Sequence, residues 1–522
     1  MMKKFFYLCS LLYAGNIAAQ VPEDAIRMSW NAPSGTARAQ AIGGAIGSLG
    51  GEITSLYANP AGLAFFKTSE FVISPGLSMY TGKSNFLGSD AKASGQNNFN
   101  LGTTGFVFGY NNPNSKWSNK AFSFAVNRTA NFNGRNYYKG ENNYSSFSEA
   151  YVEEFSQSGL PIDVFPLYSA PLSLGAKLAN YTYLIDTLTV NGRTEIAGMP
   201  QRNAILNNTD ARLMQEKDVR TTGGITELAF GFASNMDDKI YFGGSIGIPI
   251  IKYNRTTIFN ESDLSGDNNN NFNFANYRED YAQSGVGINA RLGMIFKPTE
   301  QLRAGLAIQT PTIYGLKERT TGSMSVDLEN YLDIPGVVNA NSDTIYTQNG
   351  QFIPEYRYDM YSPWKFMVSG SYVINGVEDV SQQKGFISAD VEYVTYGSTR
   401  FVSVDANDNN DYYKGVNDAV KFAYKGAFNF RVGGEMKFNT FMARLGFAYY
   451  GKPYDDNQLK GNRMNLSGGL GYRNKGIFLD LTYVHSINKD IDFPYRLSDK
   501  DNIYAGLKNN IGNVLLTLGF KF

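Results

Sequence analysis

The sequence predicts an all-β protein: a transmembrane antiparallel β-barrel of about 14 strands with an N-terminal plug in its lumen. Three observations lead to this prediction. Apolar residues alternate with small or polar residues in segments spread over most of the chain, as in strands with two different faces. The connections between these segments are alternately short and long. The chain also begins with a secretory signal.

The overall composition fits a membrane barrel. The 522 residues include 54 Gly, 35 Tyr and 36 Phe, and 47 Lys+Arg balance 47 Asp+Glu. This balance gives no basic surface for a nucleic acid, so no such partner is expected. After the first twenty residues no apolar run is long enough for a membrane-spanning helix, whereas the alternating strands of a barrel average to a neutral hydropathy.

Residues 1–19 are predicted to be a signal peptide that is cleaved after Ala19. Two lysines precede an apolar run, and small residues stand before the cleavage site. The only cysteine, Cys9, lies within this segment, so the mature chain is expected to have no thiol. With His485 as the only histidine, the sequence offers no paired imidazoles for zinc, and no metal or cofactor is expected.

Residues 20–68 are predicted to form the plug. Residues 37–66 are mostly small or apolar, and with Gly35 they include seven glycines, which disfavour a long helix. Pro60 also disfavours a central strand. The glycine pairs either let the plug backbone move or allow it to pack closely under the wall, and the sequence leaves both alternatives open. The candidate hinge and pocket residues are Gly43, Gly44, Gly50, Gly51, Phe65 and Phe66.

The barrel is predicted to span residues 69–522. Its strands alternate with period two, with apolar side chains on one face. The predicted strands are 69–80, 101–110, 120–129, 223–233, 240–248, 286–297, 302–309, 365–374, 387–393, 428–438, 441–449, 465–473, 477–483 and 503–522. The even number places both ends of the barrel in the periplasm.

The connections support this arrangement. Short turns alternate with long segments, of which 133–221, 254–283 and 317–360 are the longest and are predicted to be extracellular loops. The last strand is predicted to be one long strand with a bulge at Gly512, because a hairpin there would give an odd count. Phe520 and Phe522 end an alternating tail that resembles the signal read by the outer-membrane barrel assembly machinery.

A soluble β-sandwich would also alternate apolar and polar residues. Its strands would be shorter, however, and its second face would meet solvent. Here the second face is small or charged throughout, which favours a filled polar lumen and an apolar face covered by outer-membrane lipid. The recurring charged residues are Arg291, Arg303, Asp390, Glu392, Arg431, Glu435, Arg444 and Asp480.

The predicted plug resembles the N-terminal hatch of the FadL/TodX family of outer-membrane channels for hydrophobic compounds. The resemblance lies in residues 37–64, where a small-residue segment is followed by the family's Asn-Pro-Ala element. That element falls on Asn59, Pro60 and Ala61, followed by Gly62 and Leu63. The resemblance implies passive uptake of long-chain fatty acids or aromatic hydrocarbons through an external groove and an internal apolar pocket gated by the hatch.

The family further implies lateral release through a wall opening at a kink in the third strand. The candidate kink residues are Asn127, Asn131, Asn133 and Gly134, which are poor strand formers. The alternative is that they simply end the strand. Two helix-like pieces, 145–157 and 172–188, stand in the first long loop, and the apolar stripe of the second either forms the external groove or is buried against neighbouring loops.

The sequence supports other classes of function less well. An enzyme would need a nucleophile with a base, and no such motif stands out, so no enzymatic activity is expected. A structural or adhesive barrel without transport would share most of the sequence features except the hatch. The chain is expected to act as a monomer whose partners are hydrophobic small molecules.

Overall fold

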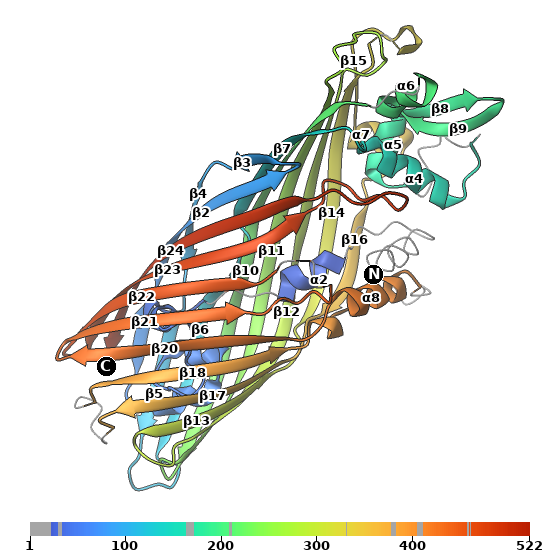
Figure 1. Cartoon of the computed structure of the whole chain (residues 1–522). Coiled ribbons are helices and arrows are strands. Elements are labelled where there is room, and N and C mark those ends of the chain that lie inside the picture. The colour runs from blue at the N-terminus through green and yellow to red at the C-terminus, as the bar shows by residue number, and fades with distance from the viewer. Residues whose placement is uncertain are drawn as a thin grey trace.

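The computed structural model describes residues 22–29, 34–162, 172–207, 211–329, 331–376, 383–404, 411–456, 459 and 461–522. The predicted signal peptide lies outside these residues. The described chain forms a closed ring of 14 antiparallel wall segments (Figure 1). We call each segment a stave; it is either one strand or two consecutive strands. The ring closes where β1 (Glu70–Ile73) and β2 (Pro75–Phe86) both pair with β24 (Ala505–Lys521). The predicted fold class and strand number are therefore confirmed.

Some staves are single strands and others are built from two consecutive strands. The single-strand staves are β10 (Leu213–Met236), β11 (Ile240–Asp263), β12 (Phe274–Phe296), β20 (Ala427–Phe438), β21 (Phe441–Tyr450), β22 (Arg463–Asn474), β23 (Ile477–Asp492) and β24. Besides β1 and β2, the paired strands are β4 (Gln96–Leu101) with β5 (Thr104–Asn111), β6 (Asn119–Asn131) with β7 (Gly134–Asn142), β13 (Leu302–Gln309) with β14 (Ile313–Asp327), β16 (Glu355–Tyr361) with β17 (Lys365–Ile374), and β18 (Gly385–Val394) with β19 (Arg400–Ser403). The short strand β3 (Ser89–Lys92) pairs with the upper end of β2.

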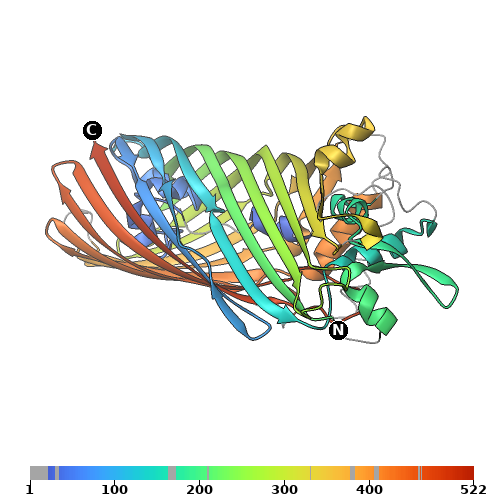
Figure 2. The ribbon, with the colours of Figure 1, turned by 90° about the horizontal axis from the view of Figure 1, so that it is seen from above.

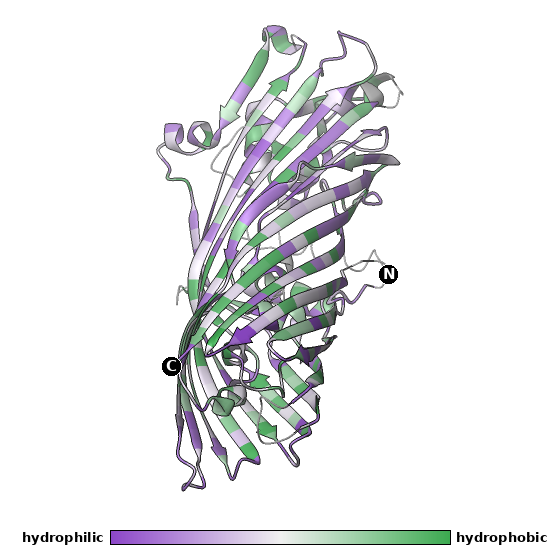
Figure 3. Ribbon diagram, turned by 90° about the vertical axis from the view of Figure 1, so that its left-hand side faces the viewer, coloured by the Kyte–Doolittle hydropathy of each residue, from purple (hydrophilic) through white to green (hydrophobic). Residues whose placement is uncertain are grey.

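The wall has an apolar outer face and a small or polar inner face. On β24, Leu516 and Phe520 are 37% and 40% exposed, whereas Leu515 and Thr517 are 0% exposed. Figure 3 shows hydrophobic residues concentrated on the lower strands and hydrophilic ones more frequent toward the upper ends of the long strands. This outward apolar band is the surface that a lipid bilayer covers in an outer-membrane barrel. None of the described helices is long and apolar enough to cross a membrane.

The prediction that 133–221, 254–283 and 317–360 are loops throughout is wrong. Parts of all three ranges are strand, because β7, β10, β11, β12, β14 and β16 continue into them. β10 and β11 have 24 residues each, about twice the roughly 9–11 residues that a tilted strand needs to span a bilayer. The sequence alternation fades there because the outer face no longer meets lipid.

An extracellular layer packs against these strand extensions. It contains α4 (Ser148–Ser158), α5 (Leu174–Tyr181), β8 (Ile185–Val190), β9 (Arg193–Gly198), α6 (Met199–Asn207), η5 (Tyr331–Asp333), β15 (Val337–Asn341), α7 (Ser342–Ile345) and η6 (Thr347–Asn349). The helix predicted over 172–188 ends at Tyr181, and β8 begins at Ile185. Leu178, Leu184 and Ile185 are at most 1% exposed, so this stripe is buried packing, as the second alternative held.

Two further helices lie below the extracellular layer, one within the ring of strands and the other at its right-hand edge in the view of Figure 1. They are α2 (Pro22–Ser29) and α8 (Asp411–Ala423), and they contact each other. Their apolar residues form one buried cluster with inward-facing side chains of the wall. We call this the lumen cluster.

Candidate functional site

The N-terminal segment, residues 34–66, is almost entirely buried and lies within the ring of strands in the view of Figure 2. It contains α3 (Ala37–Ala41), η2 (Ile53–Tyr57) and η3 (Pro60–Phe65). α3 contacts β21 to β24, whereas η3 contacts β6 and β10 to β12 on the opposite side. The segment therefore bridges the lumen.

Each short helix begins at a residue that caps it. The side chains of Thr36, Glu52 and Asn59 accept hydrogen bonds from backbone N–H groups of α3, η2 and η3. Pro60 occupies the first turn of η3, where its missing N–H costs nothing. Frequent caps and glycine turns explain why the segment is compact although no element exceeds six residues.

Asn59 joins this segment to itself and to the wall. Its Oδ1 accepts from Ala61 N at 3.2 Å, while its Nδ2 donates to the carbonyl oxygens of Gly47 at 2.6 Å, Met294 at 3.2 Å and Leu306 at 3.3 Å. Ala61 and Leu63 are 0% exposed beside it. The sequence motif is therefore a structural anchor, whatever further role it has.

Glycines allow the segment and the wall to approach closely. Gly43 has φ of 66°, and a Cβ there would lie 2.7 Å from the carbonyl oxygen of Phe447. Gly50 has φ of 71°, and a Cβ there would overlap the ring of Phe65. Gly44 and Gly51 also have positive φ. These contacts favour the close-packing alternative for Gly43 and Gly50, and a hinge role for the four glycines stays a prediction.

Buried charges tie α3 to the wall. Arg38 Nε lies 3.2 Å from Glu435 Oε2, and Arg444 contacts Glu435 and Asp480 at 2.6 Å each. The side chains of Glu435, Arg444 and Asp480 are at most 1% exposed. An ion pair buried this deeply costs several kcal/mol to break, because one charge is left without a partner. This side of the segment is therefore fixed.

Phe65 and Phe66, the candidate pocket residues, pack against protein side chains. The Phe65 ring stacks on Tyr241 at a centroid distance of 4.0 Å, and Arg303 Cζ lies 4.6 Å from its centroid. Phe66 is 4% exposed in a cluster with Val72. Their role in a ligand pocket stays a prediction.

Backbone pairing is interrupted between the second and third staves. β5 pairs with β6 only as far as Thr104 and Val126. Above this level β4 pairs with β2, and β7 pairs with β10; within the described chain no ladder joins β4 to β6 or β7. Instead the Tyr80 hydroxyl, on the buried face of β2, donates to Asn136 Oδ1 of β7 at 2.8 Å. The upper half of the third stave therefore lies inward of the wall.

The four candidate kink residues all lie at this interruption. The register between β6 and β10 shifts at Thr129, which forms a bulge. Asn127 precedes the bulge and donates to Ser34 Oγ at 3.0 Å. Asn131 ends β6, and Asn133 and Gly134 connect it to β7. β6 therefore ends at this place, and the stave continues as β7 on a path that lies inward of the wall. The role of these residues in ligand release stays a prediction.

The lumen cluster lies against the same interruption. Ala25, Ile26 and Met28 of α2 pack together with Ala130 of β6 and Ile225 of β10. α2 lies in the range 20–68 that was predicted to be the plug, but no helix was predicted there, and α8 was not predicted. Ile26 and Met28 stand as apolar residues after the signal peptide, but nothing in the sequence says that they pack with Ala130 and Ile225.

The end of the chain forms one continuous strand, as predicted. Pairing of β24 with β23 and β2 runs through Gly512 without a register shift, so the predicted bulge is wrong. Phe520 and Phe522 are 40% and 68% exposed. Their recognition by the assembly machinery stays a prediction.

No protein family model and no curated protein sequence matches the chain. Solved structures do match. A FadL homologue of Pseudomonas aeruginosa has a TM-score of 0.52 at 12% identity, with 94% of this chain and 99% of that chain covered. The toluene transporter TodX of P. putida has a TM-score of 0.51 at 14% identity, with the same coverage. At these identities the likeness establishes architecture, and the chain has the fold of the FadL homologue and TodX.

Proposed function

We propose that this protein is an outer-membrane channel for the passive uptake of hydrophobic or amphiphilic compounds, with the N-terminal segment as its hatch. The observation that carries the proposal is the interrupted pairing at the third stave, next to an apolar cluster in the lumen. One of the solved structures with this fold is described as a toluene transporter.

The anchoring of the N-terminal segment supports lateral release. Moving the whole segment would break the ion pair of Arg38 with Glu435 and the wall contacts of Asn59 at once. Passage of a ligand at the interruption above Val126 breaks no backbone pairing, because the described strands of the second and third staves do not pair there. A ligand therefore leaves through the wall while the lower segment stays in place.

The lumen cluster is the proposed internal pocket. Its apolar surface favours a hydrophobic ligand by roughly 25 cal/mol per Å² removed from water. Helix α2 fills this space in the present structure, so passage requires α2 to be displaced from Ala130 and Ile225.

Uptake of labelled toluene and oleate tests the proposal. Cells that express the chain should take up at least one of them faster than cells without it. The substitution Ala130→Trp, which adds bulk at the interruption, should reduce this uptake by about tenfold. Phe122→Trp is the matched control, because Phe122 is on the same strand but 45% exposed on the outer face.

Equal uptake with and without the chain would refute transport and leave a structural or adhesive barrel as the function. If the chain transports a probe but Ala130→Trp and Phe122→Trp give the same uptake rate, the proposed lateral route is wrong. Outer-membrane assembly of each variant is checked by its resistance to unfolding in cold detergent.

A further inference from the structure

Four exposed lysines form one row across neighbouring strands of the wall. Lys489 of β23 lies directly opposite Lys508 of β24, which lies opposite Lys83 of β2, which in turn lies opposite Lys92 of β3. Figure 1 shows these four strands next to one another. Since neighbouring strands lie about 4.8 Å apart, the row is roughly 15 Å long. We call these four residues the lysine row.

The lysine row lies on the outer face of the wall, above the apolar band. Lys489 shares its face of β23 with Ile487 and with Tyr483, which is 47% exposed. Lys83 shares its face of β2 with Leu77, which is 44% exposed. From these apolar residues to the lysines the tilted strands rise by roughly 5–15 Å. The lysines therefore lie beside the lipid headgroups of the outer leaflet rather than beside the hydrocarbon.

Within the described chain, no carboxylate pairs with the lysine row. In the adjoining rows on the same face of these four strands, Asp90 is the only described carboxylate, and its Oδ1 accepts from Asn85 Nδ2 at 2.7 Å. Four cations against one carboxylate leave a net charge of about +3. Like charges directly opposite each other destabilise a sheet, so the row would be relieved by a bound anion.

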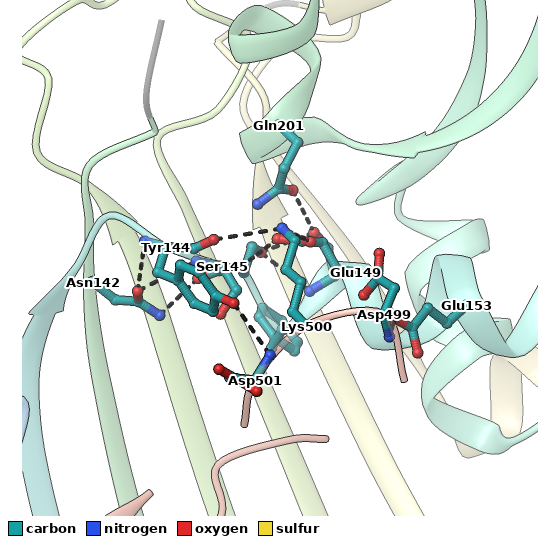
Figure 4. A network of polar contacts seen from close by, with 12 residues as sticks. Asn142, Tyr144, Ser145, Glu149, Glu153, Gln201, Asp499, Lys500 and Asp501 are labelled. Atoms are coloured by element: carbon teal, nitrogen blue, oxygen red, sulfur yellow. Dashed lines mark hydrogen bonds and ion pairs between the residues drawn. The ribbon is translucent and has the colours of Figure 1, made fainter. Parts of the chain in front are cut away.

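Other lysines of the upper wall do have carboxylate partners. Lys500, in the connection between β23 and β24, pairs with Glu149 in the polar network of Figure 4. Lys317, which is exposed on β14, lies 4.0 Å from Glu355. The lysine row differs from both, because its charges face outward without a counterion from the protein.

Protection of a free sheet edge does not explain the lysine row. Lysines on edge strands discourage pairing with another chain. However, β24 is paired on both sides at Lys508, and β2 is paired on both sides at Lys83. Among the described strands, β3 pairs with β2 alone, so edge protection would account for Lys92 and not for the rest of the row.

We propose that the lysine row binds the phosphates of a phosphorylated glycolipid in the outer leaflet of the membrane. Ammonium groups form charge-assisted hydrogen bonds with phosphate oxygens, which are stronger than those between neutral groups. Because the row faces the bilayer at headgroup level, such a lipid reaches it without leaving the membrane. A row of roughly 15 Å has room for more than one phosphate. The inference goes beyond the proposed channel and does not depend on it, since the lysines face away from the lumen.

Native mass spectrometry of the full chain from phosphatidylcholine nanodiscs tests the proposal. The matched probes are lipid A, which carries a phosphate at each end of its headgroup, and monophosphoryl lipid A. We expect lipid A to bind about tenfold more tightly, because its second phosphate adds further charge-assisted contacts. Equal affinity for the two glycolipids would overturn the inference. Displacement of lipid A by an equal concentration of inorganic phosphate would overturn its assignment to a lipid.

A variant that combines Lys83→Gln, Lys92→Gln, Lys489→Gln and Lys508→Gln should lose the preference for lipid A. Arginine at the same four positions should keep the preference, because a guanidinium also binds phosphate. Lys317→Gln is the matched control, since this exposed lysine already lies near Glu355. An unchanged preference in the glutamine variant, or an equal loss in Lys317→Gln, would contradict the proposal.

Urea unfolding in lipid vesicles separates lipid binding from a purely structural role of the lysines. In phosphatidylcholine alone, the glutamine variant should unfold at a higher urea concentration than the native chain, because the repulsion within the row is removed. Adding lipid A should stabilise the native chain and leave the variant unchanged, since a ligand stabilises the state that binds it. If lipid A stabilises both proteins equally, the lysine row is not its binding site.

Discussion

The membrane-embedded half and the extracellular half of this barrel are built in opposite ways. In the lower half the apolar residues face outward, and the interior contains glycines, hydroxyls and buried ion pairs such as that of Arg444 with Asp480. In the upper half the interior is an ordinary apolar core, in which Phe259 and Leu178 are buried. The difference follows from the solvent: lipid covers the lower wall, and water surrounds the upper one.

This contrast predicts different costs for the same kind of damage. In the lower half, removal of one member of an ion pair leaves the other charge buried, where water cannot replace the missing partner. In the upper half a lost side chain leaves a cavity, and a lost surface pair is replaced by water. The following changes test the contrast, from the largest expected effect to the smallest.

Arg444→Met should be the most damaging change. It removes the shared partner of Glu435 and Asp480, whose side chains are 0% and 1% exposed. We expect a loss of about 3–5 kcal/mol in the free energy of unfolding. Urea unfolding of the barrel in lipid vesicles measures it. Arg357→Met, which breaks a pair whose arginine side chain is 69% exposed, should cost under about 1 kcal/mol. Similar costs for both would contradict the contrast.

Phe259→Ala should loosen the upper half alone. The ring is 3% exposed and contacts Phe147 and Tyr495. We expect a loss of about 3 kcal/mol, seen as faster hydrogen exchange in residues 148–158 with no change in residues 37–66. Phe352→Ala, at a side chain that is 95% exposed, is the control. Equal loosening of both halves would show that they form one cooperative unit.

The stability of the extracellular layer should fall as the pH rises from about 4.5 to about 7. Burial raises the pKa of Glu261 to about 7, while hydrogen bonds from Ser146, Gln215 and Phe147 N oppose the shift. Between its ordinary pKa and this value the folded state binds more protons than the unfolded state, so rising pH favours unfolding, by about 1–3 kcal/mol. Proteolysis of this layer across that pH range measures the effect. Glu261→Gln should abolish the slope, and an unchanged slope would assign it to another group.

Lys500→Ala should have the smallest effect. The lysine side chain is 31% exposed where it pairs with Glu149, so water replaces much of the interaction. We expect about 0.5–1 kcal/mol, detected as slightly faster proteolysis of residues 493–502. A cost as large as that of Arg444→Met would mean that the network of Figure 4 behaves as a buried one.

Sequence patterns were reliable where lipid imposes them. Alternation located all fourteen staves, because every outward residue in the bilayer must be apolar. It failed beyond the bilayer, where residues 254–263 of β11 continue the strand with few apolar side chains. The same loss of contrast hid β7 and the upper part of β10 within a range that was predicted to be a loop.

The sequence by itself determined the barrel, its strand number and the position of the small-residue segment before the first strand, since these depend on local periodicity and composition. Only the tertiary structure decided where the inner residues meet. Arg38, Glu435 and Arg444 are scattered along the chain but share one buried site. Arg27, Lys217 and Arg496 come together at one cavity. Closure of the ring brings them together, and no local pattern encodes that contact.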